Sequence, residues 1–271
     1  MKKILNIIVY YDNDEEVDRY ITQVMSISRQ FVDIWVVVNK DEKGRLRELQ
    51  SRRSGDSRIT FINHGGNVGY LNSLLTTIKD RDISGYDYVI LSNTDIEYKE
   101  PEFFNRILAT EYTTDIGCIA PSVYNPNTGS YSNPHYRERV PEYKFKRIMR
   151  IFAFPMLADA YLKLAGMKAG STKSTKCDSC YVYSPHGSYM IFTREFLSKI
   201  KGYEYGVRMY SEESCIGELL RREKMRCFYD STIEVIHLES SVTGGMNQKR
   251  RFRMWRDSVR YILDEFYKDG K

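Results

Sequence analysis

Short runs of apolar residues alternate with amphipathic stretches over the first half of the chain. Each run has the length and the β-branched or aromatic content of a strand, and the stretches between them repeat apolar residues three to four positions apart, as helices do. The expected strands are Ile4–Tyr11, Phe31–Asn39, Arg58–Asn63 and Tyr88–Leu91, and the expected helices span about 13–30, 43–53 and 70–79. This order predicts an α/β fold with a mostly parallel, doubly wound central sheet flanked by helices.

The second half of the chain has a less regular pattern. Residues 142–170 mix basic and apolar positions and predict a helical insertion that breaks at Pro155, because proline removes a hydrogen bond from a helix interior. The other expected elements are strands at 116–123, 181–185, 188–193, 226–229 and 233–238, a helix at 212–225 and a C-terminal helix at 247–267. Neither a repeat nor a linker-like segment interrupts the chain, so we expect a single domain over 1–271.

The fourth expected strand runs directly into polar residues. Those that follow without a break are Ser92, Asn93, Thr94, Asp95 and Glu97. Open α/β sheets bind ligands at the carboxyl ends of their strands. Strand alternation would direct Asn93, Asp95 and Glu97 to one side, which suits a hard cation that carries phosphate oxygens. The alternative is a solvated turn before a helix that starts near Pro101.

Composition narrows the class of partner. The 41 basic and 36 acidic residues give a net charge of +5, which permits an anionic ligand but does not indicate nucleic-acid binding. The 22 tyrosines offer stacking faces and hydroxyls to a sugar or a nucleotide. No stretch reaches the roughly 20 apolar residues that cross a bilayer, and no signal peptide is visible. We therefore expect a cytoplasmic protein.

Two further motifs carry little weight. Cys177 and Cys180 are the only cysteines close together in sequence, and no second Cys or His pair has a matching spacing. Two unpaired thiols in a loop are therefore a better interpretation than half of a zinc site. The loop His64–Gly69 lacks both the dinucleotide fingerprint and the P-loop pattern, although its glycines allow a ligand to approach the backbone closely.

Four stretches, taken in order, form a recognisable set. They are Asn67–Tyr70, Ser92–Asp95, His186–Phe192 with Gly202–Tyr203, and Tyr210–Glu213 with Val235–Glu239. This set resembles family 2 glycosyltransferases of the GT-A fold, particularly those that build bacterial surface polysaccharides. The stretches are similar to the family's Asn-x-Gly-Phe/Tyr segment, its Asp-x-Asp or Asn-x-Asp metal motif, its acceptor-side segment, and its acidic base motif with a downstream histidine.

The likeness covers about residues 4–244 and is weakest over 124–180. It implies one Rossmann-like GT-A domain with a nucleotide-sugar-binding half at 1–123, an acceptor-binding half at 124–245 and a C-terminal helix at 246–271. It also implies an inverting hexosyl- or deoxyhexosyltransferase that acts in surface polysaccharide synthesis, such as that of a capsule or O-antigen. The donor would be a UDP- or dTDP-linked sugar, and the acceptor a saccharide or a lipid-linked saccharide.

The resemblance assigns a metal to the acidic strand end. A divalent cation neutralises the diphosphate leaving group as the glycosidic bond breaks. Asp95 is the implied metal ligand, with His237 as a further ligand and Asn93 as a supporting donor-side contact. A mixed set of oxygen and imidazole ligands favours Mn²⁺, with Mg²⁺ as the alternative. Without the resemblance, His237 would be interpreted as a structural histidine buried at the end of a strand.

The same resemblance assigns a general base, which removes a proton from the acceptor hydroxyl. Glu213 matches the position of the base and the adjacent Glu212 is the other candidate, since neighbouring carboxylates raise one another's pKa. A pair of acids at a helix N-terminus is also favoured by the helix dipole alone. The family's usual acid two positions later is Cys215 here, so no third acid is assigned. The residues that match the acceptor-side segment are His186, Gly187 and Ser188.

Besides Asn93, the resemblance implies four residues on the donor side. Tyr11 and Asp12 end the first strand where the family contacts base and ribose, and Asn67 is expected near the sugar nucleotide. Asn39 ends the second strand, but Val38 stands where the family usually has an Asp, so the sequence does not choose between uridine and thymidine. The alternative is that all four only terminate strands and turns.

The helical insertion has two interpretations. Its basic residues interleave with apolar ones, as in a helix that lies on an anionic membrane surface. The same apolar face would fit the protein's own core or a second subunit, and the basic C-terminal helix presents the same choice. These alternatives, and the oligomeric state, stay open at this point.

Two other functions compete with glycosyl transfer. A nucleotidyltransferase also uses a nucleotide and a carboxylate-bound metal, but the acidic segment Tyr11–Asp14 stands where that class has a basic, glycine-rich loop. The other is a non-catalytic protein of the same fold that only binds a glycan or a partner. Metal-dependent release of nucleoside diphosphate distinguishes the transferase from both.

Overall fold

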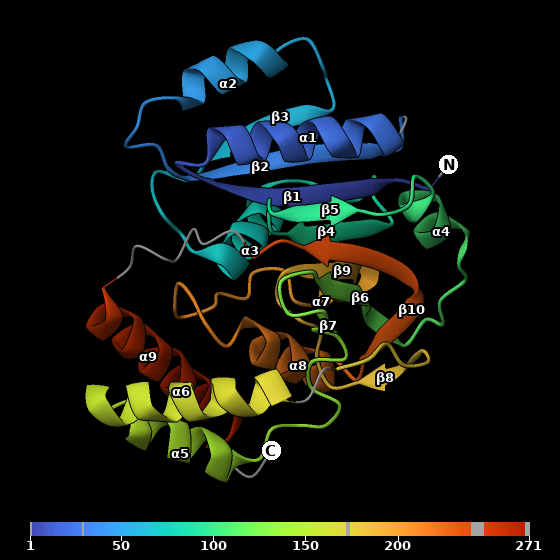
Figure 1. The fold of residues 1–271 in the computed structure, drawn as a ribbon. Helices are drawn as coiled ribbons and strands as arrows, with labels where there is room; N and C mark the ends of the chain where they lie inside the picture. Colours follow the sequence, from blue (N-terminus) through green and yellow to red (C-terminus); the bar gives the residue numbers. More distant parts are fainter. Residues whose placement is uncertain (1, 29, 172–173, 240–246, 269–271) are drawn as a thin grey trace.

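The computed structural model describes residues 2–28, 30–171, 174–239 and 247–268. A sheet passes through the molecule (Figure 1) with strand order β3-β2-β1-β4-β9-β6-β10-β5, while β7 pairs with β6 and β8 with β10. The strands are β1 (Ile4–Tyr11), β2 (Val32–Lys40), β3 (Ile59–Asn63), β4 (Tyr88–Ser92), β5 (Ile96–Tyr98), β6 (Ile116–Asn125), β7 (Ser130–Tyr131), β8 (Cys180–Val182), β9 (Tyr189–Thr193) and β10 (Arg226–His237). The helices are α1 (Asp14–Ser28), α2 (Leu46–Arg53), α3 (Tyr70–Asp80), α4 (Phe103–Ala109), α5 (Glu142–Ile151), α6 (Pro155–Ser171), α7 (Arg194–Lys199), α8 (Glu212–Arg222) and α9 (Gln248–Phe266).

The first half of the sheet confirms the predicted parallel arrangement. β1 pairs in parallel with both β2 and β4, and β2 pairs in parallel with β3. The helices α1, α2 and α3 connect these strands in the predicted order, although α1 stops at Ser28 and α2 starts at Leu46 rather than near 43. The carboxyl ends of the strands therefore meet at one edge, as in other open α/β sheets.

The second half of the sheet departs from the prediction, and one departure is the unpredicted two-residue strand β7, which pairs with β6. The strands expected at 226–229 and 233–238 are one strand, β10, whose register against β6 shifts between Asp230 and Glu234. The short strand β5 was not predicted, and it pairs antiparallel with the end of β10. Because β4 ends at Ser92, the alternation expected over residues 93–97 does not extend along one strand.

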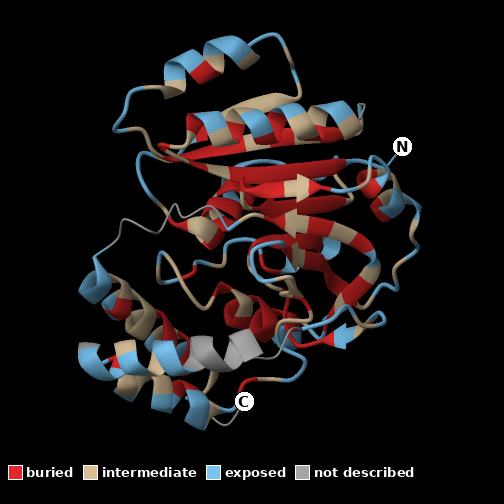
Figure 2. Cartoon of the chain, in the orientation of Figure 1, coloured by how far each residue is buried: buried red, intermediate tan, exposed pale blue. Residues whose placement is uncertain are grey.

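Helices cover both faces of the sheet with separate apolar cores (Figure 2). α1 and α4 pack on one face, where Tyr20, Ile21 and Phe104 are fully or almost fully buried. α3, α7, α8 and α9 contribute to the core on the other face, with Leu74 and Ile216 at its centre. Burying apolar surface on both sides explains why the central strands are almost continuously apolar.

The predicted insertion is two helices, α5 and α6, and α6 begins at the predicted break, Pro155. α5 packs against α9: the ring of Phe152 lies 5.3 Å from that of Phe252 and 4.8 Å from that of Trp255. One apolar face of the insertion thus belongs to the protein's own core. No helix in the described part of the chain is both long and apolar enough to cross a membrane. The domain division at 245–246 lies outside the described residues.

Candidate active site

Buried hydrogen bonds fix the end of β4. The Ser92 hydroxyl lies 2.6 Å from the Tyr20 hydroxyl and accepts a 3.2 Å hydrogen bond from Asn6 Nδ2. Tyr20 also lies 2.7 Å from the hydroxyl of Tyr98 in β5. A buried network in which each hydroxyl has partners holds the surrounding backbone rigidly, so residues 93–95 start from a fixed position.

Asp95 and His237 meet because β5 pairs with β10. Ile96 lies opposite His237 in this pairing, and Leu238 N donates a 3.0 Å hydrogen bond to the Asp95 carbonyl. As a result, Asp95 Oδ1 lies 3.3 Å from His237 Nε2, with both side chains buried. Asn93 approaches the same nitrogen, with its Nδ2 3.4 Å away. The turn after β4 is therefore partly buried, and the alternative of a solvated turn does not hold for Asp95.

This pair can hold a divalent cation between a carboxylate oxygen and an imidazole nitrogen. Within the described residues, no group of three or more His, Cys, Asp or Glu side chains forms a complete metal site. Asp95 and His237 would supply two ligands and leave the other positions for oxygens of a bound ligand or water. Such a mixed set fits Mn²⁺ and, less well, Mg²⁺.

Three of the chain's four histidines lie in a row that starts at this pair. The ring of His186 lies 5.9 Å from that of His237 and 5.3 Å from that of His135. Burial, followed by the two neighbouring histidines, lowers the pKa of His186 to about 3. His186 is therefore neutral at physiological pH, and its Nδ1 lies 2.8 Å from the Ser188 hydroxyl.

Glu212 and Glu213 begin α8 after a strained turn. Tyr210 and Ser211 both have left-handed backbone angles, with φ of 73° and 61°. Such angles cost roughly 1–3 kcal/mol at a non-glycine residue and persist where the surrounding structure requires them. Glu212 is buried, and its Oε1 accepts a 2.9 Å hydrogen bond from Tyr210 N.

The two carboxyl groups at the start of α8 have different environments. Burial and then the charge of Glu213 raise the pKa of Glu212 to about 8, so Glu212 holds a proton at neutral pH. Glu213 is only half-buried. Of the two, Glu213 is the one that a ligand can reach.

A three-residue segment joins the Asp95 side of the site to the Glu213 side. Gly187 N donates a 3.2 Å hydrogen bond to Glu213 Oε1, and the Ser188 carbonyl accepts a 2.9 Å hydrogen bond from Asn93 N. A Cβ atom at position 187 would lie 2.7 Å from Glu213 Oε1, so a larger residue there would displace the Glu213 carboxylate. The structure thus brings together seven of the predicted residues: Asn93, Asp95, His186, Gly187, Ser188, Glu213 and His237.

The sequence assigned no role to Tyr70, Tyr136 or His135, each of which lies next to a residue of the candidate site. The Tyr70 hydroxyl donates a 3.0 Å hydrogen bond to the Gly187 carbonyl, and its pKa is raised by burial and by charges that include Glu212 and Asp95. Burial and then Glu213 raise the pKa of Tyr136 to about 12. Tyr70 belongs to a matched motif and could have been proposed, whereas the loop that carries His135 and Tyr136 has no periodic pattern.

Tyr11, Asp12 and Asn39 lie at the ends of β1 and β2, and Asn67 lies in the loop before α3. Two of these predicted donor-side residues are committed to neighbouring backbone or side chains. Asp12 forms a 2.9 Å ion pair with Lys40, and its Oδ1 accepts a 3.1 Å hydrogen bond from Lys43 N. Asn39 binds the loop before α3: it donates to the Gly69 carbonyl at 3.3 Å and accepts from Val68 N at 3.3 Å. The two that keep accessible side chains are Tyr11, which is half-buried, and Asn67, which is exposed.

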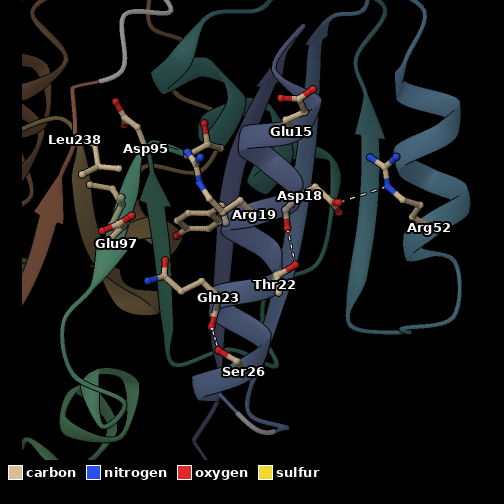
Figure 3. A pocket seen from close by; sticks show the side chains of 13 residues that line it. Glu15, Asp18, Arg19, Thr22, Gln23, Ser26, Arg52, Asp95, Glu97 and Leu238 are labelled. Atoms are coloured by element: carbon tan, nitrogen blue, oxygen red, sulfur yellow. Dashed lines mark hydrogen bonds and ion pairs between the residues drawn. The ribbon is translucent and has the colours of Figure 1, made fainter.

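A groove of about 750 Å³ runs along α1 and reaches Asp95 (Figure 3). Its walls include Arg19 and Gln23 of α1 with Glu97 and Leu238 on the other side. The lining residues do not include Glu213 or any histidine. The groove therefore meets the candidate site only at Thr94 and Asp95, and we assign the chemistry to the histidine side.

No protein-family model matches the sequence, and no curated protein matches it. Solved structures do match. The mannosyltransferase PcManGT from Pyrobaculum calidifontis, in complex with GDP-Man and Mn²⁺, aligns over 99% of this chain and 65% of its own, with 13% identity and a TM-score of 0.62. GalNAc-T7 with UDP, GalNAc and Mn²⁺ aligns over 99% of this chain and 49% of its own, with 12% identity and a TM-score of 0.64.

This chain has the fold of the GT-A glycosyltransferases. A mycobacterial protein also matches over 98% of this chain and 75% of its own, with 11% identity and a TM-score of 0.53. The chain spans about two thirds of the mannosyltransferase and about half of GalNAc-T7. At these identities the likeness establishes the fold, and the activity has to be argued from the site.

Proposed function

We propose that this protein is an inverting, metal-dependent glycosyltransferase that moves a sugar from a nucleotide-sugar donor to a saccharide acceptor. The observation that carries the proposal is the link through His186–Ser188 between the Asp95–His237 pair and Glu213. A transferase needs both groups: one to neutralise the leaving diphosphate and one to deprotonate the acceptor. The structural neighbours, solved with GDP-Man or UDP and with Mn²⁺, support the same reaction class.

Asp95 and His237 would bind the cation, Mn²⁺ or Mg²⁺, that supplies electrostatic stabilisation to the diphosphate as it leaves. The short distance between their ligand atoms supports a shared ion. Asn93 would orient the His237 ring or contact the donor through its amide. Neutral His186, next in the row, adds no second positive charge at this point.

Glu213 would accept the proton of the attacking hydroxyl. The hydrogen bond from Gly187 N holds its carboxylate in place, and protonated Glu212 beside it lessens repulsion between the two acids. Glu212 would then serve as a positioning residue. The three predicted acceptor residues, His186, Gly187 and Ser188, would lie beneath the bound acceptor.

Tyr11 and Asn67 would contact the nucleotide, because their side chains are accessible at the ends of β1 and before α3. Asp12 and Asn39 would act indirectly, by holding the loops that surround it. We propose a UDP- or dTDP-linked hexose or deoxyhexose as donor. A role in surface polysaccharide synthesis, such as a capsule or O-antigen, with a cytoplasmic location and a lipid-linked acceptor, rests on the resemblance of the four sequence stretches.

Donor hydrolysis tests the reaction class without knowledge of the acceptor. Nucleoside diphosphate release is measured from a panel of UDP-, dTDP- and GDP-linked sugars with Mn²⁺ and with EDTA. We expect release from at least one donor, lost with EDTA and restored by Mn²⁺. A folded protein that releases no nucleoside diphosphate from any donor would support a binding protein instead.

A further inference from the structure

The surface of α5 and α6 is unusually apolar. The described residues include seven large apolar side chains that are exposed, and five of these lie on the two helices or the turn between them. They are Tyr143 (64% exposed), Phe154 (62%), Met156 (87%), Leu157 (56%) and Leu164 (63%). Scattered single exposed side chains are ordinary, but a contiguous group usually marks an interaction surface.

Basic residues lie among these apolar ones. On α5, Tyr143, Arg147 and Arg150 are spaced four and three residues apart and so share one face of the helix. Arg147 and Arg150 are exposed and have no ion-pair partner within the described residues. Residues 142–164 contain five basic and two acidic side chains, and two of the basic residues are ion-paired, Lys146 with Glu142 and Lys163 with Asp159. The surface is therefore both apolar and positively charged.

We infer that this surface, formed by Tyr143, Arg147, Arg150, Phe154, Met156 and Leu157, docks on an anionic lipid bilayer. Phe, Met and Leu side chains can enter the boundary between headgroups and acyl chains, while arginines bind the phosphates of anionic lipids. Figure 2 shows α5 and the start of α6 as an exposed layer at the end of the molecule away from α2. Two antiparallel helices there would lie in the plane of the bilayer surface.

Two other occupants are less compatible with the contacts. The protein's own core already uses the opposite face of α5, where the buried Phe145 contacts Tyr267 after α9 and the buried Phe152 contacts Phe252 of α9. A second copy related by a two-fold axis would place this surface against itself. Arg147 and Arg150 of both copies would then be gathered in one interface, where their like charges repel. An anionic lipid surface has the complementary charge.

The surface is connected to the candidate active site by contacts between aromatic rings. Phe152, at the end of α5, lies 4.8 Å from Trp255, and Trp255 stacks on Tyr210 with ring centroids 5.5 Å apart and planes at 8°. Tyr210 N in turn donates to Glu212. Membrane docking would thus keep Glu213 near the bilayer, where a lipid-linked acceptor presents its sugar. This consequence rests on the proposed function, whereas docking itself does not.

Vesicle flotation tests the inference with the full-length protein. We expect binding to vesicles of phosphatidylglycerol and phosphatidylcholine at low salt, weaker binding at high salt, and no binding to phosphatidylcholine alone. Arg147→Glu/Arg150→Glu should weaken binding by about tenfold or more, because each basic residue near the surface contributes to the affinity. Met156→Ser/Leu157→Ser should weaken it as well. Arg47→Glu/Lys201→Glu, which changes the same charge at exposed positions elsewhere, should bind like the wild type.

Equal flotation of wild type and the Arg147→Glu/Arg150→Glu variant would overturn the inference, as would the absence of wild-type binding. A wild-type dimer that dissociates in the Met156→Ser/Leu157→Ser variant would show instead that the surface is an interface between copies. Donor hydrolysis without vesicles separates this result from the proposed function. It should be unchanged in all three variants, so loss of flotation with intact hydrolysis concerns docking alone.

Discussion

The donor-side and acceptor-side edges of the candidate site differ in how their polar groups are satisfied. On the donor side, Asp12 and Asn39 are buried, and each forms hydrogen bonds or ion pairs with neighbouring loops. On the acceptor side, Glu212 is buried beside a second carboxylate and accepts its hydrogen bond from a backbone N–H, that of Tyr210. Left-handed backbone angles occur on both sides, at Asp12 as well as at Tyr210 and Ser211. A buried carboxyl group that lacks a cationic partner is a cost that a stable fold avoids unless a function requires it. The difference therefore points to the start of α8 as the place where the chemistry occurs.

The largest effect on activity is expected from Glu213→Gln, on the acceptor side. The amide keeps the shape of the side chain but cannot accept the acceptor proton, so kcat for transfer should fall by about 10²–10⁴. The KM for the donor should stay within about threefold, because Glu213 is not part of the proposed donor side. Steady-state kinetics with saturating acceptor measure both. A variant that keeps its kcat would remove Glu213 from the mechanism.

Glu212→Gln should change stability rather than abolish chemistry. The pKa of Glu212 is raised from 4.5 to about 8 in the folded protein, so between these pH values the unfolded chain has lost a proton that the folded chain retains. Stability of the wild type therefore falls as pH rises through this window and levels off above it. The neutral amide removes that penalty, which for a pKa shift of this size is on the order of 5 kcal/mol above pH 8.

Urea denaturation at pH 5 and pH 8 measures this difference. The wild type should lose more stability between the two pH values than Glu212→Gln does. Glu138→Gln, which alters an exposed glutamate, is the matched control and should follow the wild type. An identical pH dependence for wild type and Glu212→Gln would show that Glu212 is not the buried, protonated group described above.

The smallest expected effect comes from Asp12→Asn on the donor side. The change removes an ion pair with the partly exposed Lys40 and should cost about 1 kcal/mol of stability, with kcat unchanged. Burial alone would raise the pKa of Asp12, but hydrogen bonds from Lys40 and Lys43 lower it overall. Stability from this group is thus present above the ordinary pKa of an aspartate and is lost as pH falls below it. A large loss of kcat in Asp12→Asn would contradict the difference drawn between the two edges.

Local patterns were sufficient for the first half of the fold. Apolar runs and helical spacing predicted β1 to α3, because strands buried on both faces and amphipathic helices leave a direct record in sequence. The break at Pro155 was predicted for the same local reason. The site residues Asp95 and Glu213 were proposed from short motifs, and their roles remain proposals.

Long-range pairing accounts for what was not predicted. β5 has only three residues, and it is a strand because the end of β10, about 140 residues later in the chain, lies beside it. That pairing is also what joins Asp95 to His237. The approach of His135 to His186 depends on an irregular loop, and no periodicity in the sequence records it. The burial of Glu212, by contrast with Glu213, follows from how α8 packs and not from the two adjacent glutamates themselves.

The central claim is that Asp95 binds the metal on which transfer depends. Its most direct test is Mn²⁺ binding measured by electron paramagnetic resonance with nucleoside diphosphate present, for the wild type and for folded Asp95→Ala. The wild type should bind Mn²⁺ in a nucleotide-dependent manner, and Asp95→Ala should lose this binding together with metal-dependent donor hydrolysis. Asp95→Ala that binds Mn²⁺ and hydrolyses the donor as the wild type does would contradict the account.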